Sequence, residues 1–257
     1  MTTTRVPGTS RAPGPVVVTV LALAAAAWIA LVATHGSSES GHAAHGGRGA
    51  ATELAGWALM VVAMMLPPAL PLAGVLSRLV AGRAGAWRYP VVALCAFVGV
   101  WVAAGAVLVS GAAGVGLLVS RVLPGAEVRA AGVVVVLAGL YQFTPLRNAC
   151  LTACRSPRWF AMRFWGGRGP ACDSAALGVA YGVSCVGCCW ALMALCLTTG
   201  AFALPVMVAL AVVMAAERLV QGGASVARGT GVVLVVLGVL LLTDLFPFAL
   251  VRPLIGA

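Results

Sequence analysis

Apolar residues run along this chain in long stretches that short polar segments separate. Seven stretches are candidates for helices, namely residues 16–34, 53–76, 90–118, 130–143, 175–200, 202–219 and 229–250. A helix of about 20 apolar residues crosses the hydrocarbon core of a bilayer. The pattern therefore predicts an all-α fold, a polytopic membrane helix bundle with about seven transmembrane helices, of which all but the first lie within residues 53–250.

The first stretch admits two interpretations. Residues 1–15 are polar and carry two arginines, which predicts a cytoplasmic tail before a retained helix at 16–34. A basic start followed by an apolar run also fits a signal peptide, whose removal would leave about six transmembrane helices. The run is long for a signal peptide and no clear cleavage site stands near His35, which favours the retained helix.

Residues 35–52 form a polar segment rich in glycine, serine and alanine, which predicts an external loop. His42 and His45 within it are close enough in sequence for both imidazoles to reach one ion. Short histidine-bearing tracts can capture metal, so these two residues are candidate ligands. A solvated linker without metal is the alternative.

Composition supports the membrane assignment and excludes other classes. Hydrophobic residues make up 62% of the chain and charged residues 9%, whereas soluble domains carry about 25% charged residues. The net charge of +10 comes from arginines in short loops, where basic residues set membrane topology. We therefore expect the lipid bilayer as a partner and no nucleic acid.

The distribution of arginine predicts an orientation. With seven crossings, twelve arginines fall on one side of the membrane and four on the other. Cytoplasmic loops carry the excess of basic residues, so the N-terminus is expected in the cytoplasm and the C-terminus outside. The longest predicted loop, residues 146–174, is then cytoplasmic.

Four cysteines fall on one face of the predicted helix at 175–200. At about 100° per residue, the four lie within a sector roughly 100° wide; they are Cys185, Cys188, Cys189 and Cys196. A stripe of thiols suits a soft metal ion or redox chemistry. Free cysteine also packs as a small apolar residue, and this alternative stays open.

Two further cysteines, Cys150 and Cys154, stand in the predicted loop at 146–174 among five arginines. On a helical turn they would face the same side. Neighbouring arginines favour the thiolate, which is both nucleophile and metal ligand. The pair is a candidate metal or redox site.

The second apolar stretch contains a proline-rich break, with Pro67, Pro68 and Pro71. Proline removes backbone donors and interrupts a helix. Just before the break, Met60 and Met64 share a helical face, while neighbouring Met65 points elsewhere. Thioethers suit Cu(I), although methionine also fills gaps in cores.

Two acidic residues stand near the ends of apolar stretches, Glu217 and Asp244. Ionisable residues inside a membrane are functional candidates by default. Near a helix end, however, such a side chain can also reach the interface, and both interpretations remain.

Several motifs together resemble a bacterial family of predicted metal-binding integral membrane proteins, a domain of unknown function. They are GLYQFTPLRNACLTACRSP at 139–157, GVSCVGCCWALM at 182–193, AMMLPP at 63–68 and AAERL at 215–219. The resemblance covers roughly residues 50–220 and implies the bacterial cytoplasmic membrane as location. The matching positions of interest are Met64, Met65, Cys150, Cys154, Cys185, Cys188, Cys189 and Glu217.

We predict from these features a membrane protein that binds a soft metal ion in transport, delivery or metallocentre assembly; the metal is copper as Cu(I), with zinc as the alternative. A small metallochaperone or a metalloenzyme client would be its partner. No nucleotide-binding loop is present, so an ATP-driven pump is not expected. The alternatives are a membrane thiol–disulfide electron shuttle, using pairs 185/188 and 150/154, and a structural subunit whose cysteines only pack.

Overall fold

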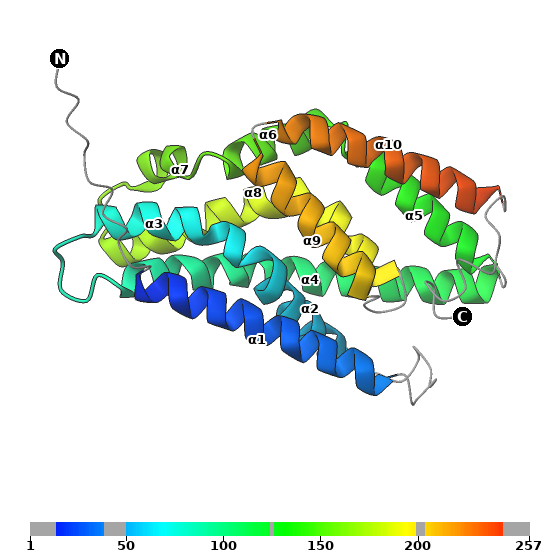
Figure 1. Ribbon diagram of the computed structural model, residues 1–257, viewed down its shortest axis with the longest axis horizontal. Coiled ribbons are helices and arrows are strands. Elements are labelled where there is room, and N and C mark those ends of the chain that lie inside the picture. Colours follow the sequence, from blue (N-terminus) through cyan, green and yellow to red (C-terminus); the bar gives the residue numbers. More distant parts are fainter. Residues whose placement is uncertain (1–13, 39–49, 124–125, 199–203, 221, 244–257) are drawn as a thin grey trace, which may run out of the picture.

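The computed structural model describes residues 14–38, 50–123, 126–198, 204–220 and 222–243. Within these residues the structure is helical, with ten α-helices and one short 3-10 helix and no strand, which confirms the all-α prediction. The helices run back and forth along the long axis of the molecule (Figure 1). Four are long and apolar enough to cross a membrane, or up to six if each of two bent helix pairs counts as one span.

Helix α1 (Pro15–Ser38) packs along the proline-broken second stretch. That stretch forms α2 (Ala50–Met65), a 3-10 turn η1 (Pro67–Ala69) and α3 (Leu70–Leu79). The axis bends by 51° at the break. The prolines stand at the first positions of η1 and α3, where a missing backbone donor costs least. The break therefore redirects the chain while both halves remain helical.

The centre of the bundle is the pair formed by α4 (Arg88–Val122) and α8 (Pro170–Thr198), which pack extensively against each other. A Cβ atom added at Gly178 on α8 would lie 2.2 Å from the backbone oxygen of Ala93 on α4. Only glycine permits this approach, as small residues do at helix interfaces in membranes. The close packing fixes the central part of α8 inside the molecule.

Most of the segment at 146–174, which the sequence analysis predicts as a loop, is helical. Helix α5 (Glu127–Tyr141) bends by 65° into α6 (Pro145–Cys154), and α7 (Pro157–Phe164) follows. The hydroxyl of Thr144 accepts a hydrogen bond from the backbone N–H of Arg147 at 3.3 Å. A Thr–Pro pair is a strong helix start, because threonine caps a free amide and proline fits the first turn. The many arginines of this segment favoured a loop, so the helix start at Thr144–Pro145 was not predicted.

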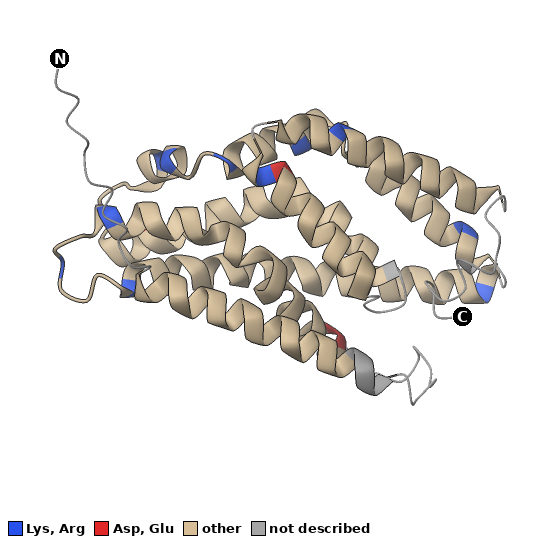
Figure 2. Cartoon of the chain, in the orientation of Figure 1, with Lys and Arg blue, Asp and Glu red and all other residues tan. Residues whose placement is uncertain are grey.

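The chain ends, within the described residues, in α9 (Leu204–Leu219) and α10 (Gly223–Leu242). Helix α9 crosses the bundle so that its C-terminal end meets α6, while α10 pairs with α5 (Figure 1). Charged residues lie near helix ends, and an acidic and a basic segment of the ribbon lie side by side at the end of α9 (Figure 2). Asp244 lies outside the described residues.

Candidate metal centre

Three cysteines of the predicted stripe are buried together at the middle of α8: Cys185, Cys188 and Cys189. The Sγ atoms of Cys188 and Cys189 are 3.3 Å apart. Both thiols also lie within hydrogen-bond reach of the carbonyl oxygen of Cys185, at 3.2 and 3.1 Å. Their sequence spacing places them on adjacent turns of one helix, so α8 alone brings three sulfurs together.

Helix α6 adds a fourth thiol from the side. The Sγ of Cys154 lies 3.8 Å from the Sγ of Cys188. The hydroxyl of Tyr181 on α8 donates a hydrogen bond of 2.9 Å to the carbonyl oxygen of Cys154. This bond ties the end of α6 to α8 and holds the Cys154 thiol beside the other three.

Cys150, one turn before Cys154, packs against Gly187 of α8. A Cβ atom at Gly187 would lie 2.6 Å from the Sγ of Cys150. The hydroxyl of Tyr141 donates a hydrogen bond of 2.5 Å to the carbonyl oxygen of Gly187. Cys150 is half-buried, so it lies between the buried thiols and the outside of the bundle.

A cation occupies the point on which the sulfurs converge. The Nη2 atom of Arg218 on α9 lies 2.9 Å from the Sγ of Cys185 and 2.8 Å from the Sγ of Cys189. The Sγ of Cys188 is 3.5 Å from the same nitrogen. Guanidinium groups are permanent cations and strong donors, whereas sulfur is a weak acceptor. The sulfurs are therefore already arranged around one positive charge.

Two residues from other helices complete the surroundings of the thiols. The Sδ of Met65, the last residue of α2, lies 3.8 Å from the Nη2 of Arg218. The indole N–H of Trp101 on α4 donates a hydrogen bond to the Sγ of Cys185 at 3.3 Å. Sulfurs from α2 and α8 thus face the same nitrogen, and an apolar aromatic side chain closes one side.

Helix α6 also holds the end of α9 that carries Arg218. Arg147 and Glu217 form a buried ion pair with 2.5 Å between Nη2 and Oε2. The guanidinium of Arg155 donates hydrogen bonds to the carbonyl oxygens of Glu217 and Val220, at 3.2 and 2.6 Å. These bonds fix the last turn of α9 and direct the two adjacent charged side chains, Glu217 and Arg218, to different partners.

The donors fit a soft ion, although they are not arranged around one. Among the described residues, no group of three or more His, Cys, Asp or Glu side chains is arranged to hold a metal ion. The Arg218 guanidinium stands where the sulfurs meet. Thiolate and thioether sulfur are the ligands that Cu(I) prefers. The donor atoms are therefore of the kind that suits a soft ion such as Cu(I), while their geometry is that of a guanidinium complex.

The remaining candidate residues are buried core residues or lie outside the described part of the chain. Cys196, Met60 and Met64 are buried in the core. Cys196 lies seven residues after Cys189 on α8, about 10 Å further along the helix axis. His42 and His45 lie outside the described residues.

The sequence interpretation missed the residues that surround the thiols. Arg218 was treated as a determinant of topology, and Arg147 as part of a cytoplasmic loop. The available signal was the adjacent Glu217–Arg218 pair at the end of an apolar stretch, because ionisable residues at such depth need partners. Trp101 gave no signal beyond its apolar character.

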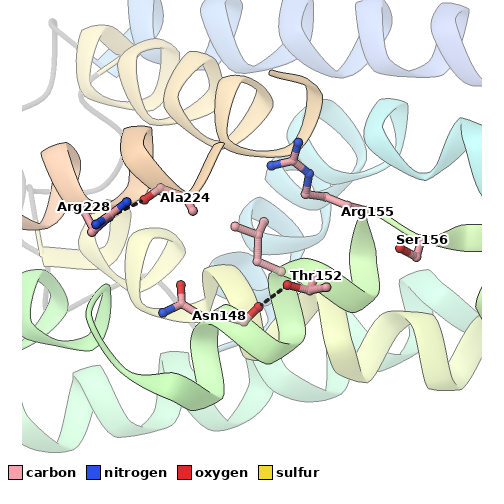
Figure 3. A pocket seen from close by; sticks show the side chains of 7 residues that line it. Asn148, Thr152, Arg155, Ser156, Ala224 and Arg228 are labelled. Atoms are coloured by element: carbon pink, nitrogen blue, oxygen red, sulfur yellow. Dashed lines mark hydrogen bonds between the residues drawn. The ribbon is translucent and has the colours of Figure 1, made fainter. Parts of the chain in front are cut away.

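A separate pocket of about 610 Å³ lies between α6 and the start of α10 (Figure 3). Polar and basic side chains line it, among them Asn148, Thr152, Arg155 and Arg228. The carbonyl oxygens of Asn148 and Ala224 accept hydrogen bonds from residues of their own helices. The pocket is therefore a basic surface feature distinct from the sulfur cluster.

Comparison with known proteins identifies a family. The family model described as "PpoB2: Copper chaperone" matches residues 54–241, well over half of the chain. No curated protein and no solved structure matches. The matched range contains the whole sulfur cluster and, apart from the first four residues of α2, the helices that build it.

Proposed function

We propose that this chain, which belongs to the PpoB2 copper chaperone family, is an integral membrane protein that binds Cu(I) among its buried sulfurs and delivers it to a client. The observation that carries the proposal is the convergence of Cys185, Cys188 and Cys189 on one cation. The family description names copper independently of this geometry. Copper is the cargo here, and the client is a metallochaperone or a metalloenzyme.

The donor set supports selection of a soft monovalent ion. Cys185 and Cys189 are the first candidate ligands, because their sulfurs lie closest to the existing cation. Burial excludes water, which hard cations such as Mg²⁺ keep in their coordination shells. A buried thiolate is costly without a compensating cation, and Cu(I) supplies one. Zinc remains the alternative metal that thiolates bind.

Cys154 supports a route for delivery. Its sulfur lies 3.8 Å from that of Cys188 but belongs to another helix. A metal ion could pass from Cys188 to Cys154 by exchange of one thiolate ligand for another. Cys150, one turn away and half-buried, would be the next ligand towards a client. The positive-inside bias predicts that α6 lies on the cytoplasmic side of the membrane. We propose that delivery takes place on that side.

The test is copper binding by the intact protein purified in detergent. We expect the wild type to bind Cu(I) in competition with a chromogenic chelator, and Cys185→Ser to weaken the affinity at least about tenfold, or about 1.4 kcal/mol. Cys196→Ser is the matched control, because Cys196 is equally buried on α8 and lies outside the cluster. Equal affinities in all three proteins, or no Cu(I) binding by the wild type, would rule the proposal out.

A thiol–disulfide shuttle is the second candidate, and the geometry favours a different pair for it. The Sγ atoms of Cys154 and Cys188 belong to different helices and lie 3.8 Å apart, whereas spacing along the sequence predicted the pairs 185/188 and 150/154. Oxidation of this pair to a disulfide would release two protons and two electrons to an acceptor. Thiol trapping after growth under oxidising and reducing conditions tests it. A Cys154–Cys188 disulfide that responds to these conditions would favour the shuttle, and its absence would favour copper binding.

A further inference from the structure

The side chain of Arg218 is held in an unusual way for a buried cation. Within the described residues, its hydrogen-bond acceptors are all sulfur atoms, and its Nη1 atom is buried without a partner. Buried arginines are normally paired with carboxylates. Sulfur is a weak acceptor. The guanidinium of Arg218 is therefore held by its burial among the sulfurs more than by strong hydrogen bonds.

A carboxylate is available next to Arg218, yet the fold directs it elsewhere. Glu217, the preceding residue, points to α6 and pairs with Arg147. Arg155 fixes the backbone of the same turn through two carbonyl oxygens. The last turn of α9 is thus anchored through its backbone and through Glu217. The guanidinium of Arg218 can move without breaking any of those contacts.

The guanidinium and a metal ion exclude each other. The Nη2 atom lies within 3 Å of two sulfurs, Cys185 at 2.9 Å and Cys189 at 2.8 Å. An ion bonded to both sulfurs would need the space that this nitrogen fills. Two cations at one buried point would also repel each other strongly in a medium of low dielectric constant. Metal binding at these sulfurs therefore requires Arg218 to withdraw.

We propose that Arg218 is an internal competitor for the copper site: its guanidinium occupies the ligand centre in the metal-free protein, yields to Cu(I), and returns when the metal is transferred. The inference rests on the proposed function and explains how the site releases Cu(I). Returning to the sulfurs, the guanidinium compensates the thiolates that the departing ion leaves behind. No nucleotide or other energy source is needed for this exchange.

The effect on affinity follows from the populations of the two side-chain positions. The apparent dissociation constant equals the intrinsic one divided by the fraction of molecules that is competent to bind. If Arg218 stays among the sulfurs about 90% of the time, the apparent affinity falls about tenfold. A site weakened in this way passes copper to a client more readily than the same four sulfurs would without the arginine.

The experiment compares Cu(I) affinity in full-length variants purified in detergent, measured by competition with a chromogenic Cu(I) chelator. We expect Arg218→Gln to bind Cu(I) more tightly, by about tenfold, and to release it to the chelator more slowly. Arg228→Gln is the matched control, since Arg228 is exposed on α10 and donates its hydrogen bond to Ala224 of the same helix. It should bind as the wild type does.

Arg218→Lys keeps the test decisive if the Gln variant does not fold. An ammonium is more strongly hydrated than a guanidinium and leaves a buried site more readily, so Lys should also tighten binding, by less than Gln. Affinity that is unchanged or weaker in every folded Arg218 variant would overturn the inference. The proposed function fails in a different way, through lack of Cu(I) binding by the wild type or an unaffected Cys185→Ser variant.

Discussion

At the scale of single residues, the feature that most constrains this molecule is the buried pair of Arg147 and Glu217. Both side chains are almost fully buried, and beyond their mutual bond the Nε and Nη1 of Arg147 and the Oε1 of Glu217 have no partner. Removing one member of a buried pair leaves an uncompensated charge, whereas replacing both by apolar residues is often tolerated. The pair therefore orients the C-terminal end of α9 more than it adds to the free energy of unfolding.

We expect Glu217→Gln to destabilise the protein by about 3 kcal/mol, because Arg147 keeps its charge and loses its partner. The double variant Arg147→Met/Glu217→Leu should recover most of this loss. Thermal unfolding of the detergent-solubilised proteins measures both effects. A single variant as stable as the wild type would mean that water reaches this pair and that it does not anchor α9.

At the scale of elements, the site depends on how closely α6 approaches α8. The approach occurs at Gly187, where the hydroxyl of Tyr141 also binds the backbone. From the sequence, the spacing of Cys150 and Cys154 indicated a shared face on any helical turn, and α6 provides that turn. Which element that face meets depends on the 65° bend before α6. The bend comes from Pro145, but its direction follows from packing, which no local pattern encodes.

Gly187→Ala should destabilise the protein by about 1–3 kcal/mol, as overpacking of a tight contact does. The new Cβ would lie 2.6 Å from the Sγ of Cys150, but 3.4 Å from its Cβ. The double variant Gly187→Ala/Cys150→Ala should therefore regain stability in thermal unfolding. Gly99→Ala on α4, where a Cβ meets nothing within 4 Å, serves as the control. A stable single variant would contradict the close packing of α6 on α8.

At the scale of the whole molecule, the long helices run back and forth, while α2 and α3, and likewise α5 and α6, continue in one general direction as bent pairs (Figure 1). The sequence predicts seven crossings. The helices that meet the length and hydropathy expected of a span give four crossings, or up to six with the bent pairs. Helix α9, with 16 residues, is the candidate for the remaining crossing. Whether α9 crosses decides on which side the C-terminus lies, and charge alone predicts that it does.

Reporter fusions test this arrangement. A fluorescent protein fused to the N-terminus should fluoresce, because that end is predicted in the cytoplasm, and alkaline phosphatase fused after residue 243 should be active outside. A matched fusion of each reporter at residues 81–86, between α3 and α4, should behave as cytoplasmic. Two termini on the same side would show that α9 does not cross or that the first helix is removed.

The sequence by itself determined the all-α class of this protein, because long apolar stretches with few charges favour helices long enough to cross a bilayer. It also determined the thiols of α8, since helical periodicity places Cys185, Cys188 and Cys189 on one face within two turns. Only the tertiary structure decided what that face meets. Cys154 and Arg218 stand 31 and 33 residues from Cys185 along the chain, and their convergence depends on the direction of the bend before α6 and on the anchoring of α9. The tertiary structure thereby places a cation among the sulfurs, a relation that neither periodicity nor charge count along the sequence contains.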